Sequence, residues 1–381
     1  MNEGTTRRLA RLERKSALAC RNKRSPFHKP CRASLRRIPF ADLVKKWKLS
    51  LLFVLSLVCS PAFAVEITDL GTLGGGWSAA YAMNDLDQVV GISEAESGEI
   101  HAFLYSNGQM TDLDPLTGLI SEPMGINNAG QIAGGVIATD GVVYPAVYDN
   151  GKVTIPGTLG GIGGGVLAGL ATAINESGQV VGFSYLPNGE WHAFLYGNGI
   201  MRDLGCPSSE GGACYSYAID INDYGQIVGG SSYDRAFLYS NGRMTYIDPP
   251  YSSSGRAYGI NNHGQIAGYF YKEDTGRGFF YSQNTFINFA AVNSPYTTGF
   301  ALNELGQVVG GAFVWDDHGC RVCDYRRHAI MFDNGVVTDL NTLLPANSGW
   351  ELVWAYAINN SGHIVGEGMM NGQTHAFLVR L

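Results

Sequence analysis

The sequence is poor in charged residues and in helical pattern. Only 15% of its 381 residues are Asp, Glu, Lys or Arg, whereas globular proteins average about 25%. Residues 65–381 contain 11 Lys and Arg against 30 Asp and Glu, so this part has no basic surface and we exclude nucleic acid as a general partner. No stretch of it keeps an apolar period near 3.6 residues, which excludes a helical fold.

Long apolar runs are also absent. The longest, Leu49–Val58, is soon interrupted by Pro61, and a membrane span needs about 20 apolar residues. Lysines precede this run and Ala62-Phe63-Ala64 follows it, which is the pattern of a secretory signal peptide. We expect cleavage after Ala64, export to the extracellular space, periplasm or cell surface, and no stable membrane span afterwards. A retained anchor is the alternative; lipidation at Cys59 is disfavoured because Val58 is not small.

The N-terminal region predicts two further segments. Residues 1–43 form a basic leader, unusually long for a signal peptide, and no second Met occurs before Met83. A start at Val44 would give a signal peptide of ordinary length over 44–64, so we interpret 1–43 as a misassigned start, with a disordered leader as the alternative. The expected organisation is a leader (1–43), a signal peptide (44–64) and one folded domain (65–381).

What the chain has in abundance is glycine and a repeated phrase. Residues 65–381 hold 50 of its 51 glycines. The phrase Ala-x-x-Asn-x-x-Gly-Gln-Val/Ile-Val/Ala-Gly returns seven times with variations, followed by His-Ala-Phe-Leu-Tyr, Asn-Gly and Met-x-Asp-Leu. Its marker Asn falls at Asn84, Asn127, Asn175, Asn222, Asn261, Asn303 and Asn359. The mean spacing, about 46 residues, is close to the length of a four-stranded propeller blade.

Turn signals divide each copy into four short strands. In the first copy we predict strands at 81–84, 88–92, 101–105 and 109–113. Asn107-Gly108 lies between the last two and is typical of a tight hairpin turn, in which both residues adopt positive φ. A glycine ends the turn between the first two strands in six copies, and Asp87 replaces it in the first.

The two ends of the domain complement each other. The seventh copy stops after His375-Ala376-Phe377-Leu378 and lacks its fourth strand, whereas Ile67-Thr68-Asp69-Leu70 matches the fourth strand of the first copy, Met110-Thr111-Asp112-Leu113. Pairing the termini in this way removes an exposed sheet edge. We therefore predict an all-β, seven-bladed β-propeller closed by the N-terminal strand. A β-solenoid remains the alternative.

The His-Ala-Phe phrase carries a resemblance to a known family. It occurs at His101, His192 and His375 and is varied elsewhere, and in this it resembles the HAF family of probable extracellular repeats of bacteria over essentially all of 65–381. The resemblance implies an exported repeat protein and supplies no catalytic residues. Four copies carry His in the phrase and the others Arg or Tyr, so we favour a packing role for these side chains over a metal site.

One face of the predicted propeller varies between copies. The marker Asn is always four residues from the following Gln or His, but the connection between the second and third strands changes in length. Variable loops on a fixed scaffold commonly bind ligands. Four tryptophans, which can stack on sugars or anchor a protein, fall on this face: Trp77, Trp191, Trp315 and Trp350. The alternative is that they cap the apolar gaps between blades.

Four cysteines lie beyond the signal peptide, on the same variable face. They form two local pairs, Cys206 with Cys214 and Cys320 with Cys323, which predicts two disulfides in an exported protein. The alternative for the second pair is a zinc site completed by His318 and His328, although the spacing matches no common zinc motif.

Together these observations favour an exported, monomeric, non-catalytic binding protein for a glycan or protein partner, without a metal or cofactor. The alternative is a propeller hydrolase or lyase with carboxylates at the mouth of the central channel. The predicted inner strands are small and apolar apart from Asp220, which favours binding over catalysis.

Overall fold

The computed structural model describes residues 65–114, 120–207, 214–232, 234–250, 252–273, 275–315 and 325–381. Their named elements are β-strands and one 3-10 helix, η1 (Leu340–Leu343). The expectations for 1–64, including the signal peptide, and for the Cys320–Cys323 pair lie outside this part of the chain. Within the described residues, no helix has the length and apolar character needed to cross a membrane.

Antiparallel sheets of four strands are the unit of the fold, and in four of them the strands are consecutive in the chain. The first two are β2 (Gly74–Met83), β3 (Val89–Ala95), β4 (Ile100–Ser106) and β5 (Gln109–Asp112), then β6 (Ile120–Ile126), β7 (Ile132–Ile137), β8 (Val143–Asp149) and β9 (Lys152–Thr154). The next two are β10 (Gly169–Ile174), β11 (Val180–Tyr185), β12 (Trp191–Gly197) and β13 (Ile200–Asp203), then β14 (Ser216–Ile221), β15 (Ile227–Ser231), β16 (Arg235–Ser240) and β17 (Arg243–Tyr246).

A larger sheet of eight strands follows. It consists of two antiparallel groups of four, β18 (Ser254–Ile260), β19 (Ile266–Lys272), β20 (Thr275–Ser282) and β21 (Thr285–Phe289), then β22 (Tyr296–Leu302), β23 (Val308–Trp315), β24 (Tyr325–Asp333) and β25 (Val336–Asp339). The groups are joined by a parallel contact between β20 and β22 at a single residue pair, Gly276 and Tyr296.

The last sheet combines the two ends of the domain. It contains β26 (Trp350–Ile358), β27 (Ile364–Met370) and β28 (Gln373–Arg380), with β1 (Glu66–Asp69) as its fourth strand. β1 pairs antiparallel with β28, from Glu66 opposite Arg380 to Asp69 opposite Phe377. The N-terminal strand therefore occupies the position that the seventh repeat leaves empty in the sequence.

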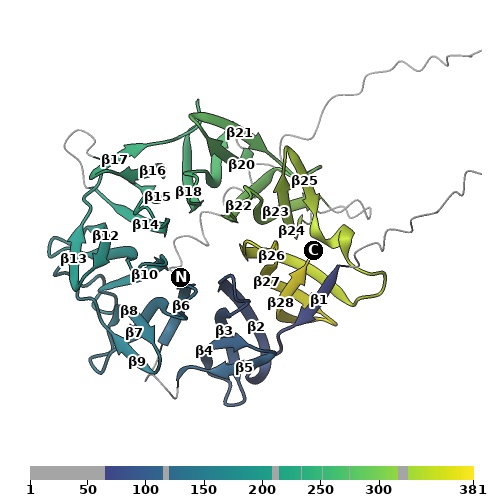
Figure 1. Ribbon diagram of the computed structural model, residues 1–381, viewed down its shortest axis with the longest axis horizontal. Helices are drawn as coiled ribbons and strands as arrows, with labels where there is room; N and C mark the ends of the chain where they lie inside the picture. Colours follow the sequence, from purple (N-terminus) through teal and green to yellow (C-terminus); the bar gives the residue numbers. More distant parts are fainter. Residues whose placement is uncertain are drawn as a thin grey trace, which may run out of the picture. The chain divides into compact units, whose positions relative to one another are not determined.

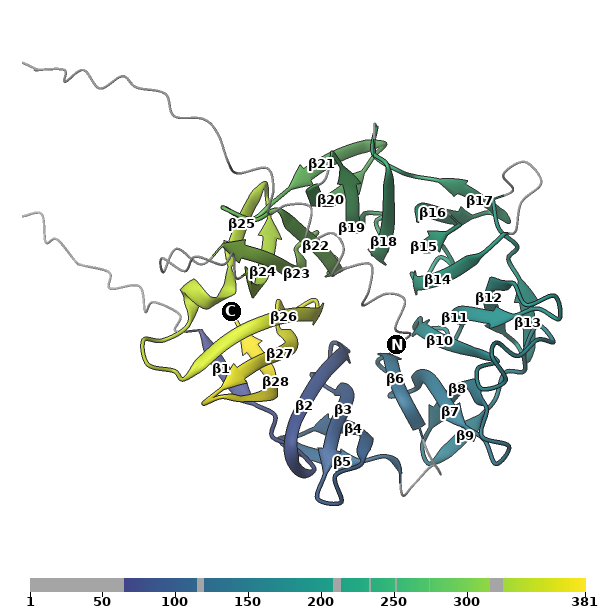
Figure 2. The ribbon, with the colours of Figure 1, turned by 180° about the vertical axis from the view of Figure 1, so that it is seen from behind.

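The sheets are arranged around a common centre, as in a β-propeller. In Figure 1 the first strand of each repeat, such as β6, β10 or β14, lies toward the centre, and the last, such as β9, β13 or β17, lies at the periphery. Figure 2 shows the same order from behind. Because the inner strands come from repeats far apart in the sequence, the centre is where distant residues meet.

The inner strands are longer than the sequence predicted. β2 begins at Gly74 rather than Tyr81, because its pairing with β3 continues beyond a β-bulge between Ala80 and Ala82. The same irregularity recurs in the inner strand of every repeat. Opposite each bulge lies the glycine that closes the repeated phrase; a Cβ on Gly91 would lie 2.0 Å from the carbonyl oxygen of Ala79. The bulge thus explains why each repeat has glycine there.

The hairpin turns have the predicted conformation. Asn107 and Gly108 have φ of 53° and 79°, and the other Asn-Gly pairs share these positive values. Gln283-Asn284, the exception in the sequence, adopts the same conformation at 49° and 61°. Asp87, which replaces glycine in the first inner turn, is also left-handed at 57°, so the scaffold imposes the turn even where the sequence departs from it.

The core lies between neighbouring sheets and is built around the Phe of the His-Ala-Phe phrase. Phe103 is fully buried, as are its counterparts Phe194, Phe237, Phe279 and Phe377. One apolar cluster joins Phe103 and Val89 of the first repeat to Val365 and Leu378 of the seventh. A buried side chain of this size contributes roughly 1.5–3 kcal/mol, so packing between the first and last repeats is a substantial part of the fold's stability.

Candidate functional site

Two sets of hydrogen bonds link the marker-Asn turns of successive repeats, at one end of the central region. Each marker Asn donates its side-chain amide to the main-chain carbonyl of the next marker, as Asn84 does to Asn127 at 3.0 Å. Its side-chain oxygen accepts hydrogen bonds within its own turn, from the N–H groups of Leu86 and Gln88. The marker Asn therefore fixes its own turn, and the bond between repeats adds a role that the sequence did not reveal.

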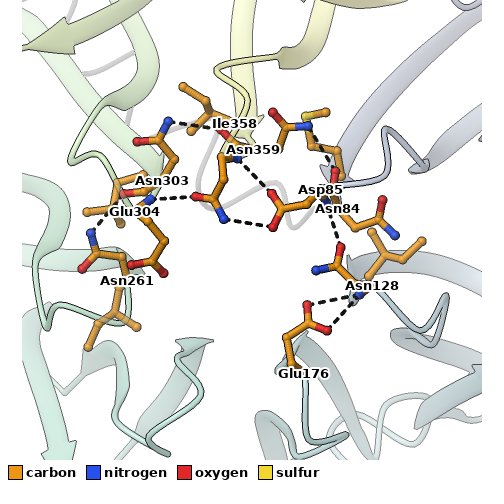
Figure 3. Close-up of a pocket in the computed structure, with 14 residues that line it drawn as sticks. Asn84, Asp85, Asn128, Glu176, Asn261, Asn303, Glu304, Ile358 and Asn359 are labelled. Atoms are coloured by element: carbon orange, nitrogen blue, oxygen red, sulfur yellow. Dashed lines mark hydrogen bonds between the residues drawn. The ribbon is translucent and has the colours of Figure 1, made fainter.

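The residue after each marker forms the second set. Its main-chain N–H donates to the side-chain oxygen of the corresponding residue in the next repeat, as Asp85 does to Asn128 at 2.9 Å and Asn128 to both oxygens of Glu176. Figure 3 shows some of these side chains, among them Asp85, Asn128, Glu176 and Glu304, around a cavity of about 160 Å³. Four of the seven residues are carboxylates and three are amides: Asp85, Asn128, Glu176, Asp223, Asn262, Glu304 and Asn360.

We call this ring of seven polar residues the polar mouth, and its hydrogen bonds serve to connect neighbouring repeats. The carboxylates at its edge accept main-chain N–H groups, and within the described residues no group of three or more His, Cys, Asp or Glu side chains is arranged to hold a metal ion. Burial raises the pKa of Glu176, which is the direction expected for a carboxylate surrounded by protein rather than solvent.

The histidines of the repeated phrase pair with carboxylates on the outermost strand. His101 contacts Asp112 at 2.8 Å, and His192, His328 and His375 make equivalent pairs with Asp203, Asp339 and Asp69. In the fourth repeat Arg235 pairs with Asp248 at 2.6 Å. These contacts are separate and lie on different blades, so they hold the two outer strands together and do not converge on one site.

The four predicted tryptophans lie in strands, not in connections, because the strands extend further than the turns indicated. Trp77 lies in β2, Trp191 begins β12, Trp315 ends β23 and Trp350 begins β26. Trp315 is 39% exposed. Trp350 packs against an apolar core cluster and meets Phe377 edge-on at 6.3 Å.

Trp191 is part of a small aromatic group beside a disulfide. Its ring lies 4.2 Å from that of Tyr215 and 5.6 Å from that of Tyr185. Cys206 and Cys214 are bonded, as predicted, and the main-chain N–H of Cys214 donates to Glu190, next to Trp191. The disulfide therefore fixes a connection close to this tryptophan.

Asp220, the charged residue that the sequence singled out on an inner strand, has both carboxylate oxygens engaged. One accepts the N–H of Ile221 in its own strand, and the other accepts the N–H of Ile260 in the next repeat, each at 2.8 Å. Burial raises the pKa of Asp220 to about 6, although both hydrogen bonds act in the opposite direction. These contacts indicate a link between repeats.

The most distinctive group is a circuit of seven aromatic rings spanning three successive repeats. Each ring contacts the next, with centroids 5.4 to 6.2 Å apart. None of the seven is fully buried, and Tyr271 and Tyr296 are each 37% exposed. In order, the circuit is Tyr258, Tyr269, Tyr271, Tyr296, Phe313, Trp354 and Phe300. The inner-strand position of Tyr258 and Phe300, three residues before the marker, carries Met124, Thr172 and Ile219 in the second to fourth repeats.

Two arginines flank this aromatic circuit. Arg256 lies over the Tyr217 ring and forms an ion pair with Asp234. The exposed Arg327 lies over the rings of Phe313 and Trp354, 5.6 and 5.7 Å from their centroids. Such cation–π contacts hold a guanidinium in place while leaving its donors available.

Next to the aromatic circuit, the seventh, first and second repeats contribute carboxyl and phenol groups. The hydroxyl of Tyr356 donates to Glu367 at 3.2 Å. Burial raises the pKa of Glu367, against the opposing effects of this bond and of Arg327. Burial also raises the pKa of Tyr81 to about 12, with Glu367 and Glu122 adding to the shift, so Tyr81 lies within electrostatic reach of two carboxyl groups.

The sequence predictions missed this group. The strand containing Trp354 was interpreted only as small and apolar, and Glu122 and Glu367 were not singled out. The signal available was the departure from repeat symmetry, because aromatic residues at the position three before the marker occur only in the fifth, sixth, seventh and first repeats.

No known family profile matches the chain, and no curated protein matches it. Among solved structures, it is similar to the β-propeller domain of the Trilobed protease from Pyrococcus furiosus, at 8% identity and a TM-score of 0.49, covering 81% of this chain and 94% of that one. It is also similar to TolB from Acinetobacter baumannii, at 12% identity, 74% and 77% coverage and a TM-score of 0.38. A third similar structure is the lectin BP39L from Burkholderia pseudomallei, at 9% identity and a TM-score of 0.38, covering 83% of this chain and 95% of that one. These likenesses assign no function.

Proposed function

We propose that residues 65–381 form an exported, seven-bladed propeller that acts as a non-catalytic binding module. The eight-stranded sheet counts as two blades in this interpretation, because a single residue pair joins its halves. Closure is supported by the pairing of β1 with β28 and by the hydrogen bond from Asn359 to Asn84. Export rests on the signal-peptide pattern and is compatible with the Cys206–Cys214 disulfide. The HAF-type phrase supports the same proposal.

The aromatic circuit is the observation that carries the binding proposal. A propeller stabilised by one repeated core has no structural need for seven touching, partly exposed rings in only three of its repeats. Exposed aromatic rings stack on the apolar faces of sugars and anchor protein partners. We place the ligand at this circuit and favour a glycan. The predicted tryptophans Trp77, Trp191, Trp315 and Trp350 are the candidates for additional contacts.

A glycan array and a screen of secreted proteins, probed with the purified full-length product, test this function. The decisive comparison replaces Tyr271 and Tyr296 with Ala, because both rings are exposed and their loss should leave the fold intact. Tyr224→Ala is the matched control, since this tyrosine is 77% exposed and lies in a turn beside the polar mouth. We expect the double variant to lose at least tenfold in affinity and the control to bind normally. Equal binding by both would contradict the assignment.

A hydrolase or lyase remains the second candidate, favoured by the carboxyl groups of Glu122 and Glu367 around Tyr81. Burial raises the pKa of both carboxyls, a property of groups that act as general acids. Loss of a measured glycan-cleaving activity in Glu367→Gln, with binding retained, would favour this candidate over the binding module.

A further inference from the structure

Arg327 differs from the other arginine at the aromatic circuit in forming no ion pair with a carboxylate of the described residues. Arg256 is neutralised by Asp234. The guanidinium of Arg327 contacts two ring faces, and among the described residues it has neither an ion pair nor a hydrogen bond. Its side chain is exposed. A guanidinium fixed in this way presents a planar set of donors that fits a carboxylate with two parallel hydrogen bonds.

The rings next to Arg327 offer a stacking surface at the same place. Phe313 lies beneath the guanidinium, and its ring is 6.0 Å from that of Tyr296, which is 6.2 Å from that of Tyr271. These two tyrosines are the most exposed members of the circuit. A ligand with an apolar face and a carboxylate at its edge could therefore contact the tyrosines and Arg327 together.

The charge of the chain narrows the choice of ligand. Residues 65–381 have an excess of acidic residues, which disfavours a polyanion such as a nucleic acid or a densely sulfated chain. The charge of Glu367 reaches Arg327 without forming an ion pair, so a neutral sugar would leave the guanidinium donors without a carboxylate to bind. A saccharide with one carboxylate, on the sugar beside Arg327, supplies a partner for the guanidinium and brings little further negative charge against an acidic protein.

We propose that the aromatic circuit binds a uronate-containing saccharide, with Arg327 pairing with its carboxylate and Tyr271 and Tyr296 stacking against its pyranose rings. This inference rests on the proposed binding function and adds the class of ligand. Glu367 and Asp234 lie near the circuit, but the first accepts a hydrogen bond from Tyr356 and the second is paired with Arg256. Arg327 is therefore the specificity-determining residue for the acid group.

The test uses the purified exported protein and oligosaccharides that carry one galacturonate, glucuronate or mannuronate residue, each beside its carboxyl-reduced counterpart. Affinities are measured by calorimetry for the wild type and for Arg327→Gln. Arg202→Gln is the matched control, because Arg202 is an exposed arginine on the outer strand β13. We expect one uronate to bind at least tenfold more tightly than its reduced form, Arg327→Gln to abolish this preference, and Arg202→Gln to retain it.

The outcomes separate this inference from the function on which it rests. If a neutral glycan binds at the circuit and neither carboxyl reduction nor Arg327→Gln changes its affinity, the uronate proposal is wrong and the binding function stands. Equal losses in Arg327→Gln and Arg202→Gln would also overturn it, because they would indicate general charge attraction. If no glycan binds and no secreted protein is retained, both proposals fail.

Discussion

The side-chain amide of Asn359 donates a hydrogen bond to the main-chain carbonyl of Asn84, 275 residues earlier in the chain, at 3.3 Å. The six other marker residues make the same bond to the next marker at 3.0 to 3.1 Å. The last repeat therefore contacts the first through the same interaction that joins all other neighbours. This bond, the β1–β28 pairing and the apolar cluster shared by the first and last repeats support a closed ring.

Removing residues 65–72 should destabilise the domain sharply. The deletion takes away β1 and leaves β28 as an open edge, and it also removes Leu70 from the core cluster shared by the first and last repeats. Urea denaturation of the truncated and intact proteins measures the difference. Unchanged stability would show that the N-terminal strand does not close the fold.

Asn261→Ala should lower the free energy of unfolding by about 1–3 kcal/mol, because it leaves buried main-chain groups without partners. Asn261 accepts from the N–H groups of His263 and Gln265 and donates to the carbonyl of Asn303. Asn288→Ala, on the exposed part of β21, is the control and should change stability little. Chemical denaturation of both variants provides the comparison, and equal effects would exclude a special role for the marker.

Gly310→Ala should be strongly destabilising because its Cβ would lie 1.8 Å from the carbonyl oxygen of Thr298. The substitution forces the bulge of β22 away from β23, and a strain of this kind in a packed structure typically costs about 1–3 kcal/mol or more. Gly197→Ala is a matched control, since the nearest atom to its Cβ would be 3.5 Å away. The measurement is the melting temperature of each variant, and we expect a much larger decrease for Gly310→Ala. A similar change in both variants would mean that the bulge tolerates a side chain.

The His328–Asp339 pair should make stability depend on pH. The hydrogen bond that His328 donates to Asp339 raises the pKa of His328 above its ordinary value of 6.5, so this contribution is complete below pH 6.5 and is lost as the pH rises through the raised folded-state pKa. Burial raises the pKa of Asp339, but the bond to His328 and those from Asn341 outweigh it and leave the pKa below 3.8. The Asp339 contribution is therefore present above pH 3.8 and is lost as the pH falls through the lowered value.

The measurement is the loss of unfolding free energy in His328→Gln at pH 5.5 and at pH 9. We expect a larger loss at pH 5.5. Asp339→Asn should remove the same pH dependence, and a double-mutant cycle should assign it to the pair. A loss that does not vary with pH would show that the histidine acts by packing alone.

Intact mass of the exported product, with and without reductant, tests the processing predictions. We expect cleavage after Ala64 and two disulfides, Cys206 to Cys214 and Cys320 to Cys323.

The Cys206–Cys214 disulfide closes a short loop, which contributes about 2–3 kcal/mol in the chain-entropy account. Cys206→Ser should therefore lower the melting temperature under oxidising conditions but not under reducing ones. A retained leader or four free thiols would contradict these predictions.

Much of the architecture follows from the sequence because its causes are local. The Asn-Gly turns and the left-handed residues are fixed by neighbours a few positions away, so one phrase repeated seven times predicts strands and turns together. The match between Ile67–Leu70 and the missing last strand extends this reasoning to the termini. The length of the inner strands was underestimated, since a bulge interrupts the alternating pattern of β2 at Ala80 and Ala82.

The aromatic circuit was decided only by the tertiary structure. Tyr258, Phe300 and Trp354 each occupy an ordinary inner-strand position, and they are 42 and 54 residues apart in sequence. They become neighbours because consecutive repeats place equivalent strands side by side around the centre. The placement of Arg327 over Phe313 and Trp354 depends on this juxtaposition, since Trp354 comes from the next repeat. Repeat symmetry could be read from the sequence, but contacts that break it exist only once the repeats are packed together.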